Sequence, residues 1–247
     1  TTPSIGAIEV AINDPNIVYV GTGSDGLRSN VISGKGMYKS IDAGKTWEHV
    51  GLKDVGQIGA VEIDPTNNNI VWVAAIGNAF KPNSERGIYK TIDGGQNWEK
   101  VLFVSDKVGF ADLELLPGNP NIVYAAAWKG ERKPWTIISG GENKEGGIYK
   151  SINGGKDWVK LDKGLPKGLI GKIDLAVSAV NSSILYAVIE APDKEGGLYK
   201  SVDQGKSFKQ VSSNSGLVNR PFYYTNIELD PTNPNIIYSN ANPLLKS

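Results

Sequence analysis

Arginine and aromatic side chains gather in the segments that separate the apolar runs of this sequence. Eight of them are candidate ligand-binding residues: Arg28, Arg86, Trp128, Arg132, Trp135, Arg220, Tyr223 and Tyr224. Guanidinium groups bind carboxylates through two N–H donors, and aromatic rings offer flat apolar faces with polar edges. This combination predicts a site for a glycan, a peptide carboxylate or a protein surface. The alternative is structural, because strands exclude charge and arginines then fall in loops without any binding role.

Glycoside hydrolysis is the enzymatic chemistry that the same segments could perform. It needs two carboxyl groups across the scissile bond, roughly 6.5–9.5 Å apart in inverting enzymes. The acidic candidates are Asp25, Glu85, Asp106, Glu131, Glu142, Asp193 and Glu195. None of these lies in a motif that selects it as the acid or the base, so the catalytic residues stay unassigned.

The composition argues against metal, cofactor and nucleic-acid chemistry. The chain has no cysteine and a single histidine, His49, so it can build neither a thiolate site nor a His-rich metal site. No phosphate-binding glycine loop is present. The 26 basic and 26 acidic residues balance, which gives no attraction for nucleic acid or an anionic membrane. No apolar run approaches the length of a membrane span.

The elements that position these side chains recur along the chain. Ile-Tyr-Lys, or a close variant, precedes the pattern S/T-x-D-x-G-x-x-W, which begins at residues 40, 91, 151 and 201. The third copy has Asn for Asp, and the fourth has Phe for Trp. The residues of the pattern are Asp42, Gly44, Trp47, Asp93, Gly95, Trp98, Asn153, Gly155, Trp158, Asp203, Gly205 and Phe208. A period of about 50 to 60 residues, filled with short apolar segments, is typical of a propeller or array.

We interpret the repeated pattern as a tight turn between two strands, and call it the box turn. The Asp or Asn oxygen is expected to accept hydrogen bonds from backbone N–H groups two or three residues on. The glycine supplies a positive φ, and the aromatic residue starts the outgoing strand and buries its ring. A catalytic or metal-binding role is the alternative, but a catalytic carboxylate has no reason to recur in every repeat.

The chain is therefore predicted to be all-β: an arc of four four-stranded blades plus the inner strands of a fifth. The expected blades cover residues 5–50, 58–103, 110–162, 172–212 and, incompletely, 224–247. No segment has a helical period. Lys246-Ser247 align with the start of a box turn, so we expect the segment to belong to a larger propeller. The remainder of that propeller, or a larger assembly, would then cover the exposed sheet edges.

Because successive strands run in opposite directions, the connections between them lie alternately at the two ends of each blade. The turns rich in Asp, Pro and Asn and the box turns fall at one end. The loops between second and third strands and the connections between blades fall at the other, which we call the long-loop face. All eight candidate ligand-binding residues belong to the long-loop face, where binding residues held by a rigid scaffold commonly lie.

The box turns and their lead-in resemble the Asp-box, or BNR, repeats of sialidases, sortilin-type receptors and xyloglucanase-like glycoside hydrolases. The blocks Val55-Gly56-Gln57-Ile58-Gly59, Arg132-Lys133-Pro134-Trp135-Thr136 and Arg220-Pro221-Phe222-Tyr223-Tyr224 are similar to those of bacterial sortilin-like BNR-repeat proteins often labelled glycosyl hydrolases. The resemblance covers essentially the whole chain and implies a β-propeller and an extracytoplasmic location. The Arg-Ile-Pro signature of sialidases is missing before the first box turn, which disfavours sialidase chemistry.

Two functional classes follow from these observations. The first is a noncatalytic scaffold of an exported protein that binds a protein, a peptide or a glycan through the long-loop face. The second is a fragment of a xyloglucanase-like glycoside hydrolase, which requires two facing acids, one with a raised pKa. An accessory subunit that only packs in a larger assembly is a third possibility.

Overall fold

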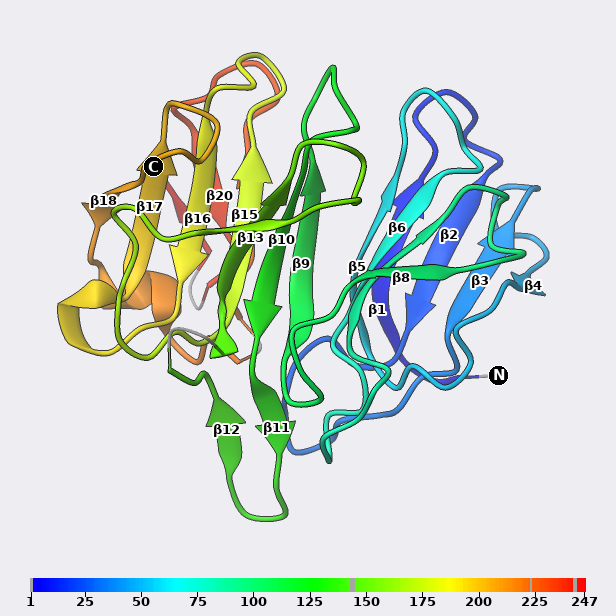
Figure 1. Ribbon diagram of the computed structural model, residues 1–247, viewed down its shortest axis with the longest axis horizontal. Helices are drawn as coiled ribbons and strands as arrows, with labels where there is room; N and C mark the ends of the chain where they lie inside the picture. The colour runs from blue at the N-terminus through cyan, green and yellow to red at the C-terminus, as the bar shows by residue number, and fades with distance from the viewer. Residues whose placement is uncertain (1, 143–144, 223, 242–243) are drawn as a thin grey trace. The chain divides into compact units, whose positions relative to one another are not determined.

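The protein is built from successive antiparallel sheets, seen in a computed structural model that describes residues 2–142, 145–222, 224–241 and 244–247 (Figure 1). Four sheets have four strands and a fifth has three, and each sheet is one blade of a β-propeller. The all-β prediction and its blade-by-blade repeat are therefore confirmed. Short 3-10 turns at η2 (Asp193–Glu195) and η3 (Ser215–Val218) interrupt the β structure. No helix within the described ranges is long and apolar enough to cross a membrane.

The chain divides into two compact units. The first unit contains Thr1–Leu113 and Glu131–Ile137, and the second contains Glu114–Gly130 and Ile138–Ser247. The first blade has strand order β1-β2-β3-β4, and the second has order β5-β6-β7-β8. Their strands are β1 (Ile5–Val10), β2 (Val18–Thr22), β3 (Met37–Ser40), β4 (Glu48–His49), β5 (Ile58–Ile63), β6 (Val71–Ala75), β7 (Gly87–Thr91) and β8 (Glu99–Leu102).

The remaining blades repeat this order. The third is β9 (Gly109–Leu115), β10 (Val123–Trp128), β13 (Gly147–Ser151) and β14 (Val159–Leu161). The fourth is β15 (Ile173–Val177), β16 (Leu185–Ile189), β17 (Gly197–Ser201) and β18 (Lys209–Ser212). The fifth is β19 (Ile227–Leu229), β20 (Ile237–Ser239) and β21 (Leu245–Lys246). A separate hairpin, β11 (Gly130–Arg132) and β12 (Ile137–Ser139), stands between β10 and β13, where the sequence suggested only a long loop.

The second strand of each blade is the most deeply buried, because it is enclosed by neighbouring strands and by both faces of the sheet. All residues of β2, β6, β10 and β16 are buried. Their near-continuous apolar sequences fit this position, since a strand covered on both faces has no reason to alternate. The last strands of the blades lie at sheet edges, and β4 and its lone His49 are exposed.

The box turns are closed by one carboxylate or amide that accepts a hydrogen bond from the backbone N–H four residues ahead. The three aspartates also interact with the backbone N–H three residues ahead, which lies within the predicted range. Asp93 Oδ1 accepts from the Asn97 N–H at 2.9 Å, and Asp93 Oδ2 accepts from Asn97 Nδ2 at 2.8 Å. The Thr91 hydroxyl donates to Asp93 Oδ1 at 2.7 Å and accepts from the Gly95 N–H at 3.0 Å. The side chain therefore spans the whole turn, which has more residues than a simple Asx turn.

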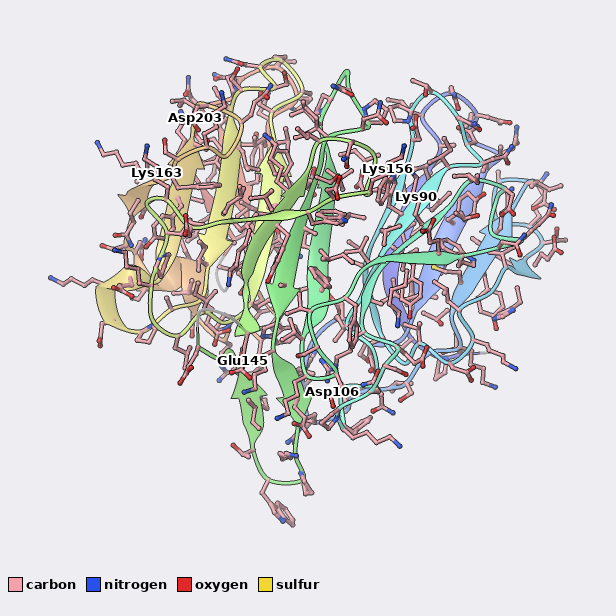
Figure 2. The ribbon with its side chains drawn as sticks, viewed as in Figure 1. Lys90, Asp106, Glu145, Lys156, Lys163 and Asp203 are labelled. Carbon is pink, nitrogen blue, oxygen red and sulfur yellow. The ribbon has the colours of Figure 1, made fainter. Side chains whose placement is uncertain are left out.

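The other three box turns repeat this geometry. The residue at the Asp position accepts from the backbone N–H four positions on at 2.8–3.0 Å; the pairs are Asp42–Thr46, Asn153–Asp157 and Asp203–Ser207. In the third turn the extra amide donor is used, because Asn153 Nδ2 donates to Asp157 Oδ2 at 2.8 Å. Figure 2 shows Asp203 in the turn that joins β17 to β18.

Two consecutive residues of every box turn have a positive φ. The glycine of the pattern has a positive φ, as predicted: 84°, 98°, 89° and 81° at Gly44, Gly95, Gly155 and Gly205. The residue before it does so too, and in the first and fourth turns it is Ala43 at 58° and Gln204 at 59°. A non-glycine residue with positive φ is strained, and the hydrogen bonds of the turn must offset that cost.

A lysine over an aromatic ring recurs in all five blades. The lysine of the Ile-Tyr-Lys lead-in lies opposite an aromatic residue of the second strand, and its Nζ is 4.4–5.2 Å from the ring centroid. The pairs are Lys39–Tyr19, Lys90–Trp72, Lys150–Tyr124, Lys200–Tyr186 and Lys246–Tyr238. Directly opposed cross-strand residues are close enough for such cation–π contacts, so the lead-in lysine is part of the blade.

Candidate functional site

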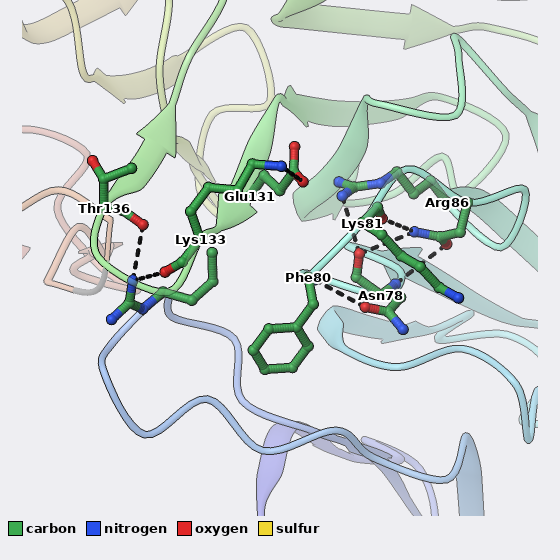
Figure 3. A network of polar contacts seen from close by, with 9 residues as sticks. Asn78, Phe80, Lys81, Arg86, Glu131, Lys133 and Thr136 are labelled. Atoms are coloured by element: carbon green, nitrogen blue, oxygen red, sulfur yellow. Dashed lines mark hydrogen bonds and ion pairs between the residues drawn. The ribbon is translucent and has the colours of Figure 1, made fainter.

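Three segments of the first unit meet on the long-loop face and form a set of contacts that we call the loop cluster. Its parts are the β2–β3 loop around Arg28, the β6–β7 loop at 77–86, and the hairpin turn at 131–137. Figure 3 labels residues of the last two segments. The Arg132 N–H donates to the Ala79 oxygen at 2.7 Å, and Arg132 Nε donates to the Arg28 oxygen at 3.2 Å. Segments about a hundred residues apart in sequence are thus joined by one arginine.

The β6–β7 loop is held in shape by two asparagines. Asn83 Nδ2 donates to the Asn78 oxygen at 3.0 Å and to the Lys81 oxygen at 2.8 Å. Asn78 Oδ1 accepts from the Phe80 N–H at 2.9 Å. Asn side chains stabilise turns in this way by replacing backbone partners. The loop is therefore fixed, with Phe80 45% exposed on it.

Gln57 supports the same loop from beneath and was not a candidate in the sequence. It is fully buried, its Oε1 accepts from the Ala79 N–H at 2.8 Å, and its Nε2 donates to the Ile32 oxygen at 3.3 Å. A polar side chain inside an apolar run was the available signal, because a buried amide has to be hydrogen-bonded.

Arg86 lies inside the loop cluster and not on its surface. The side chain is only 1% exposed, and Nη2 donates to the Asn78 oxygen at 3.1 Å. Burial lowers the pKa of Arg86 to about 10, while the nearby carboxylates of Glu131 and Asp106 act in the opposite direction. Arg86 is thus still a cation at neutral pH, and it braces the loop where a ligand could not reach it directly.

The hairpin turn carries the most exposed aromatic side chain of the cluster. Arg132 Nη1 donates to the Thr136 oxygen at 2.8 Å and also to the Lys133 oxygen, while the Lys133 N–H donates to the Thr136 oxygen at 2.9 Å. The Lys133 ammonium pairs with Glu131. Trp135, between these anchored residues, is 97% exposed. A large apolar ring presented to solvent on an ordered turn marks an interaction site.

The other predicted binding residues lie in the second unit, and Trp128 there is structural. It is fully buried, and its Nε1 donates to Ser139 Oγ at 3.1 Å, which ties β10 to β12. Arg220 has a φ of 56°, and its oxygen accepts from the Tyr224 N–H at 3.2 Å, so the two residues close one local turn. Tyr223 lies outside the described residues.

A partly buried carboxyl group of the second unit was missed because the sequence placed it at the start of a loop. Glu190 follows β16 directly, accepts from Ser139 Oγ, and accepts from the Lys172 N–H at 2.8 Å. Burial raises the pKa of Glu190, against these hydrogen bonds and the charge of the buried Lys172. The sequence signal that could have identified Glu190 is an acidic residue directly after the five apolar residues of a strand, Leu185–Ile189.

Two of the acids named from the sequence have side-chain partners close to them in the chain. Glu85 accepts from Ser84 Oγ at 2.8 Å, and Glu131 pairs with Lys133. Figure 2 shows the candidate Asp106 in the first unit, and in the second unit Glu145, which was not a candidate and forms an ion pair with Lys129 at 2.9 Å. Within the described ranges, no three His, Cys, Asp or Glu residues are grouped so as to hold a metal ion.

Fold and repeat together define a β-propeller in which the first four blades share one hydrogen-bonded turn between their third and fourth strands. No protein-family model matches the chain. The chain is 27% identical over 189 residues to the xyloglucanase Xgh74A of Acetivibrio thermocellus, a match that covers 64% of this chain and 19% of that enzyme. It thus spans about a fifth of the length of the curated relative.

Solved structures with the same fold include GH74 enzymes. An ancestral GH74 enzyme superposes with a TM-score of 0.68 and 22% identity, over 96% of this chain and 27% of that one. The GH74 enzyme of Niastella koreensis superposes with a TM-score of 0.68 and 16% identity, over 98% of this chain and 36% of that one. The GH74 xyloglucanase of Xanthomonas campestris superposes with a TM-score of 0.66 and 16% identity, over 95% of this chain and 35% of that one. At these identities the likeness shows the propeller fold alone.

Proposed function

We propose that this chain is a noncatalytic propeller segment of the BNR-repeat, sortilin-like kind, which binds a β-glucan-type polysaccharide through the loop cluster. One observation carries the proposal: Trp135 is 97% exposed on a turn that Arg132 fixes with two side-chain hydrogen bonds. An exposed ring held rigidly loses little conformational entropy when a ligand stacks on it.

A glycan is favoured over a peptide carboxylate by the side chains that remain accessible. Arg86, one of the predicted carboxylate ligands of the cluster, is buried and engaged with its own loop. The exposed groups include the rings of Phe80 and Trp135 and the cations Arg28 and Lys81, and Lys133 is paired with Glu131. Flat rings with a few polar neighbours suit the apolar faces and hydroxyl edges of sugars. The similarity to a protein named a xyloglucanase supports the same ligand class.

The experiment is to measure binding of xyloglucan by affinity electrophoresis and calorimetry for the wild type and Trp135→Ala. Loss of a central aromatic contact costs about 2 kcal/mol, so affinity should fall roughly 30-fold. Phe103→Ala is the matched control, because Phe103 is 47% exposed in the same unit but outside the cluster. Equal affinity of wild type and Trp135→Ala would remove the cluster from the binding site.

A fragment of a xyloglucanase-like glycoside hydrolase is the second candidate. It is favoured by the similarity to Xgh74A and by Glu190, whose pKa is raised by burial as a general acid requires. A hydrolase should release reducing ends from xyloglucan, and Glu190→Gln should abolish that release while leaving binding intact. If the wild type releases no reducing ends from xyloglucan, the result would favour the binding function.

We also propose that the protein works outside the cytoplasm. The resemblance to exported BNR-repeat proteins supports this location, and a polysaccharide ligand would be met there. Fractionation of cells that produce the full-length polypeptide tests it, and recovery only in the cytoplasmic fraction would contradict it.

A further inference from the structure

The third box turn contains the only Asn-Gly dipeptide of the sequence, Asn153-Gly154. The side-chain amide of an asparagine can be attacked by the backbone nitrogen of the next residue, and a glycine leaves that nitrogen unshielded because it has no Cβ atom. Both residues are partly exposed, and Gly154 has a φ of 70°. Water therefore reaches the amide that closes this turn.

The hydrogen bonds of the turn act on this amide in two opposite ways. Asn153 Oδ1 accepts from Ser151 Oγ at 3.1 Å and from the Asp157 N–H at 3.0 Å, so two donors withdraw electron density from Cγ. Asn153 Nδ2 donates to Asp157 Oδ2 at 2.8 Å, and the Gly154 N–H donates to the Asn121 oxygen at 2.9 Å. These last two bonds hold the leaving group and the attacking nitrogen in place, so reaction follows local opening of the turn.

Asp157 makes the third box turn chemically different from the others. In the first, second and fourth turns the residue at this position donates to Oδ2 of the turn aspartate at 2.6–2.8 Å; these donors are Thr46, Asn97 and Ser207. In the third turn the roles are exchanged, because Asn153 donates and Asp157 accepts. A carboxylate at position 153 would therefore place a second negative charge against Asp157, where a hydrogen bond now stands.

We propose that Asn153 is a site of spontaneous deamidation, and that this modification loosens the third box turn irreversibly. The Gly154 nitrogen forms a bond to Cγ of Asn153 and gives up its proton, while the Cγ–Nδ2 bond breaks and Nδ2 leaves with a proton as ammonia. Water then opens the five-membered succinimide: addition at Cγ yields aspartate, and addition at the backbone carbonyl yields isoaspartate. One water is consumed and one ammonia is released, with no oxidant or reductant.

Both products disturb the turn. Aspartate at position 153 keeps the Oδ1 acceptor but repels the carboxylate of Asp157. Isoaspartate adds a methylene group to the backbone, which displaces the Asp157 N–H from its acceptor. The third blade thus changes in one direction only, at a rate set by how often this turn opens.

Peptide mapping by mass spectrometry of the full chain, aged in mildly alkaline buffer, tests the reaction. The conversion of an amide to an acid is followed at Asn153 and at Asn97, which precedes Trp98 in the second box turn and serves as the internal reference. We expect Asn153 to react faster and to yield both aspartate and isoaspartate. Gly154→Ala is the matched variant, because Ala43 occupies the same position of the first turn with a φ of 58°. Its added Cβ atom should slow the reaction by about tenfold, the factor that about 1.4 kcal/mol of barrier produces.

The effect on the turn is tested separately by calorimetry. We expect Asn153→Asp to lower the Tm by about 2–4 °C, the change expected from one lost contact in a chain of this size. The double variant Asn153→Asp with Asp157→Asn reproduces the Asp93–Asn97 pair of the second turn and should restore most of that loss.

Three results would overturn the proposal. One is an Asn153 that reacts no faster than Asn97, and another is a rate that Gly154→Ala leaves unchanged. The last is an Asn153→Asp variant as stable as the wild type, or a double variant no more stable than the single one, because the carboxylates would then not oppose each other.

Discussion

At the scale of single residues, the box-turn carboxylate acts on its own turn. Asp93 accepts from Asn97 N–H, Asn97 Nδ2 and Thr91 Oγ1, at 2.7–2.9 Å. Its oxygens are used within seven residues of sequence, which explains why the sequence could identify the turn. The four-residue reach was not predicted, because it depends on two consecutive residues with positive φ.

Replacing Asp93 tests its structural role. We expect Asp93→Ala to lower the Tm while leaving xyloglucan affinity unchanged, and Asp93→Asn, which keeps the Oδ1 acceptor as Asn153 does in the third box turn, to restore most of the Tm. Asp54→Ala, at an exposed position outside the box turns, serves as the control. Differential scanning calorimetry measures all three, and lost binding by a fully stable Asp93→Ala would assign the carboxylate to the site instead.

The same carboxylates make stability depend on acid pH. Hydrogen bonds from the residue four positions on lower the pKa of Asp42, Asp93 and Asp203 to about 2, from an ordinary value near 3.8. The unfolded chain then binds protons before the folded chain does, so this stabilisation is complete above about pH 4 and is lost toward pH 2. Urea midpoints from pH 7 to pH 2 should show that fall, and Asp93→Asn should show a smaller one. Equal falls in both proteins would contradict the assignment.

Burial was the residue property that the sequence could not supply. Arg86 and Arg132 are of the same type and both lie on the long-loop face, but Arg86 is 1% exposed. Its surroundings include the Asn78 oxygen, to which it donates, and the charge of Glu131, a residue 45 positions further along the chain. Trp128 and Trp135 differ for the same reason: one ring is fully buried and the other is 97% exposed.

At the scale of elements, strands were predictable and the hairpin was not. Apolar runs such as Val71–Ala75 are long enough to be read directly as buried strands. The strands β11 and β12 are three residues each and only partly buried, so their sequences carry no clear alternation. Their pairing is fixed by the turn between them. In that turn the Lys133 N–H and the Arg132 side chain both donate to the Thr136 oxygen.

Arg132→Lys tests whether the hairpin presents Trp135. Lysine keeps the charge but loses the guanidinium fork that reaches Thr136, Lys133 and Arg28. We expect faster amide exchange at Lys133, weaker xyloglucan binding, and a global Tm close to the wild type. Unchanged exchange and unchanged affinity would show that the turn does not depend on this arginine.

At the scale of the whole molecule, the repeat determines the fold and leaves the activity open. Five sheets built on one pattern place every long connection at the same end of its blade, and the structures of GH74 enzymes share this fold. Function then depends on which side chains those connections expose. In the first unit they expose Trp135 and Phe80 around a rigid, polar interior.

Mapping a bound sugar across the molecule tests the central claim most directly. A xyloglucan oligosaccharide is titrated into isotopically labelled protein, and amide chemical shifts are followed by NMR. We expect saturable changes concentrated at residues 77–86 and 131–137, with the Trp135 indole signal moving most. Changes confined to the box turns, or no saturable change at all, would contradict glycan binding at the loop cluster.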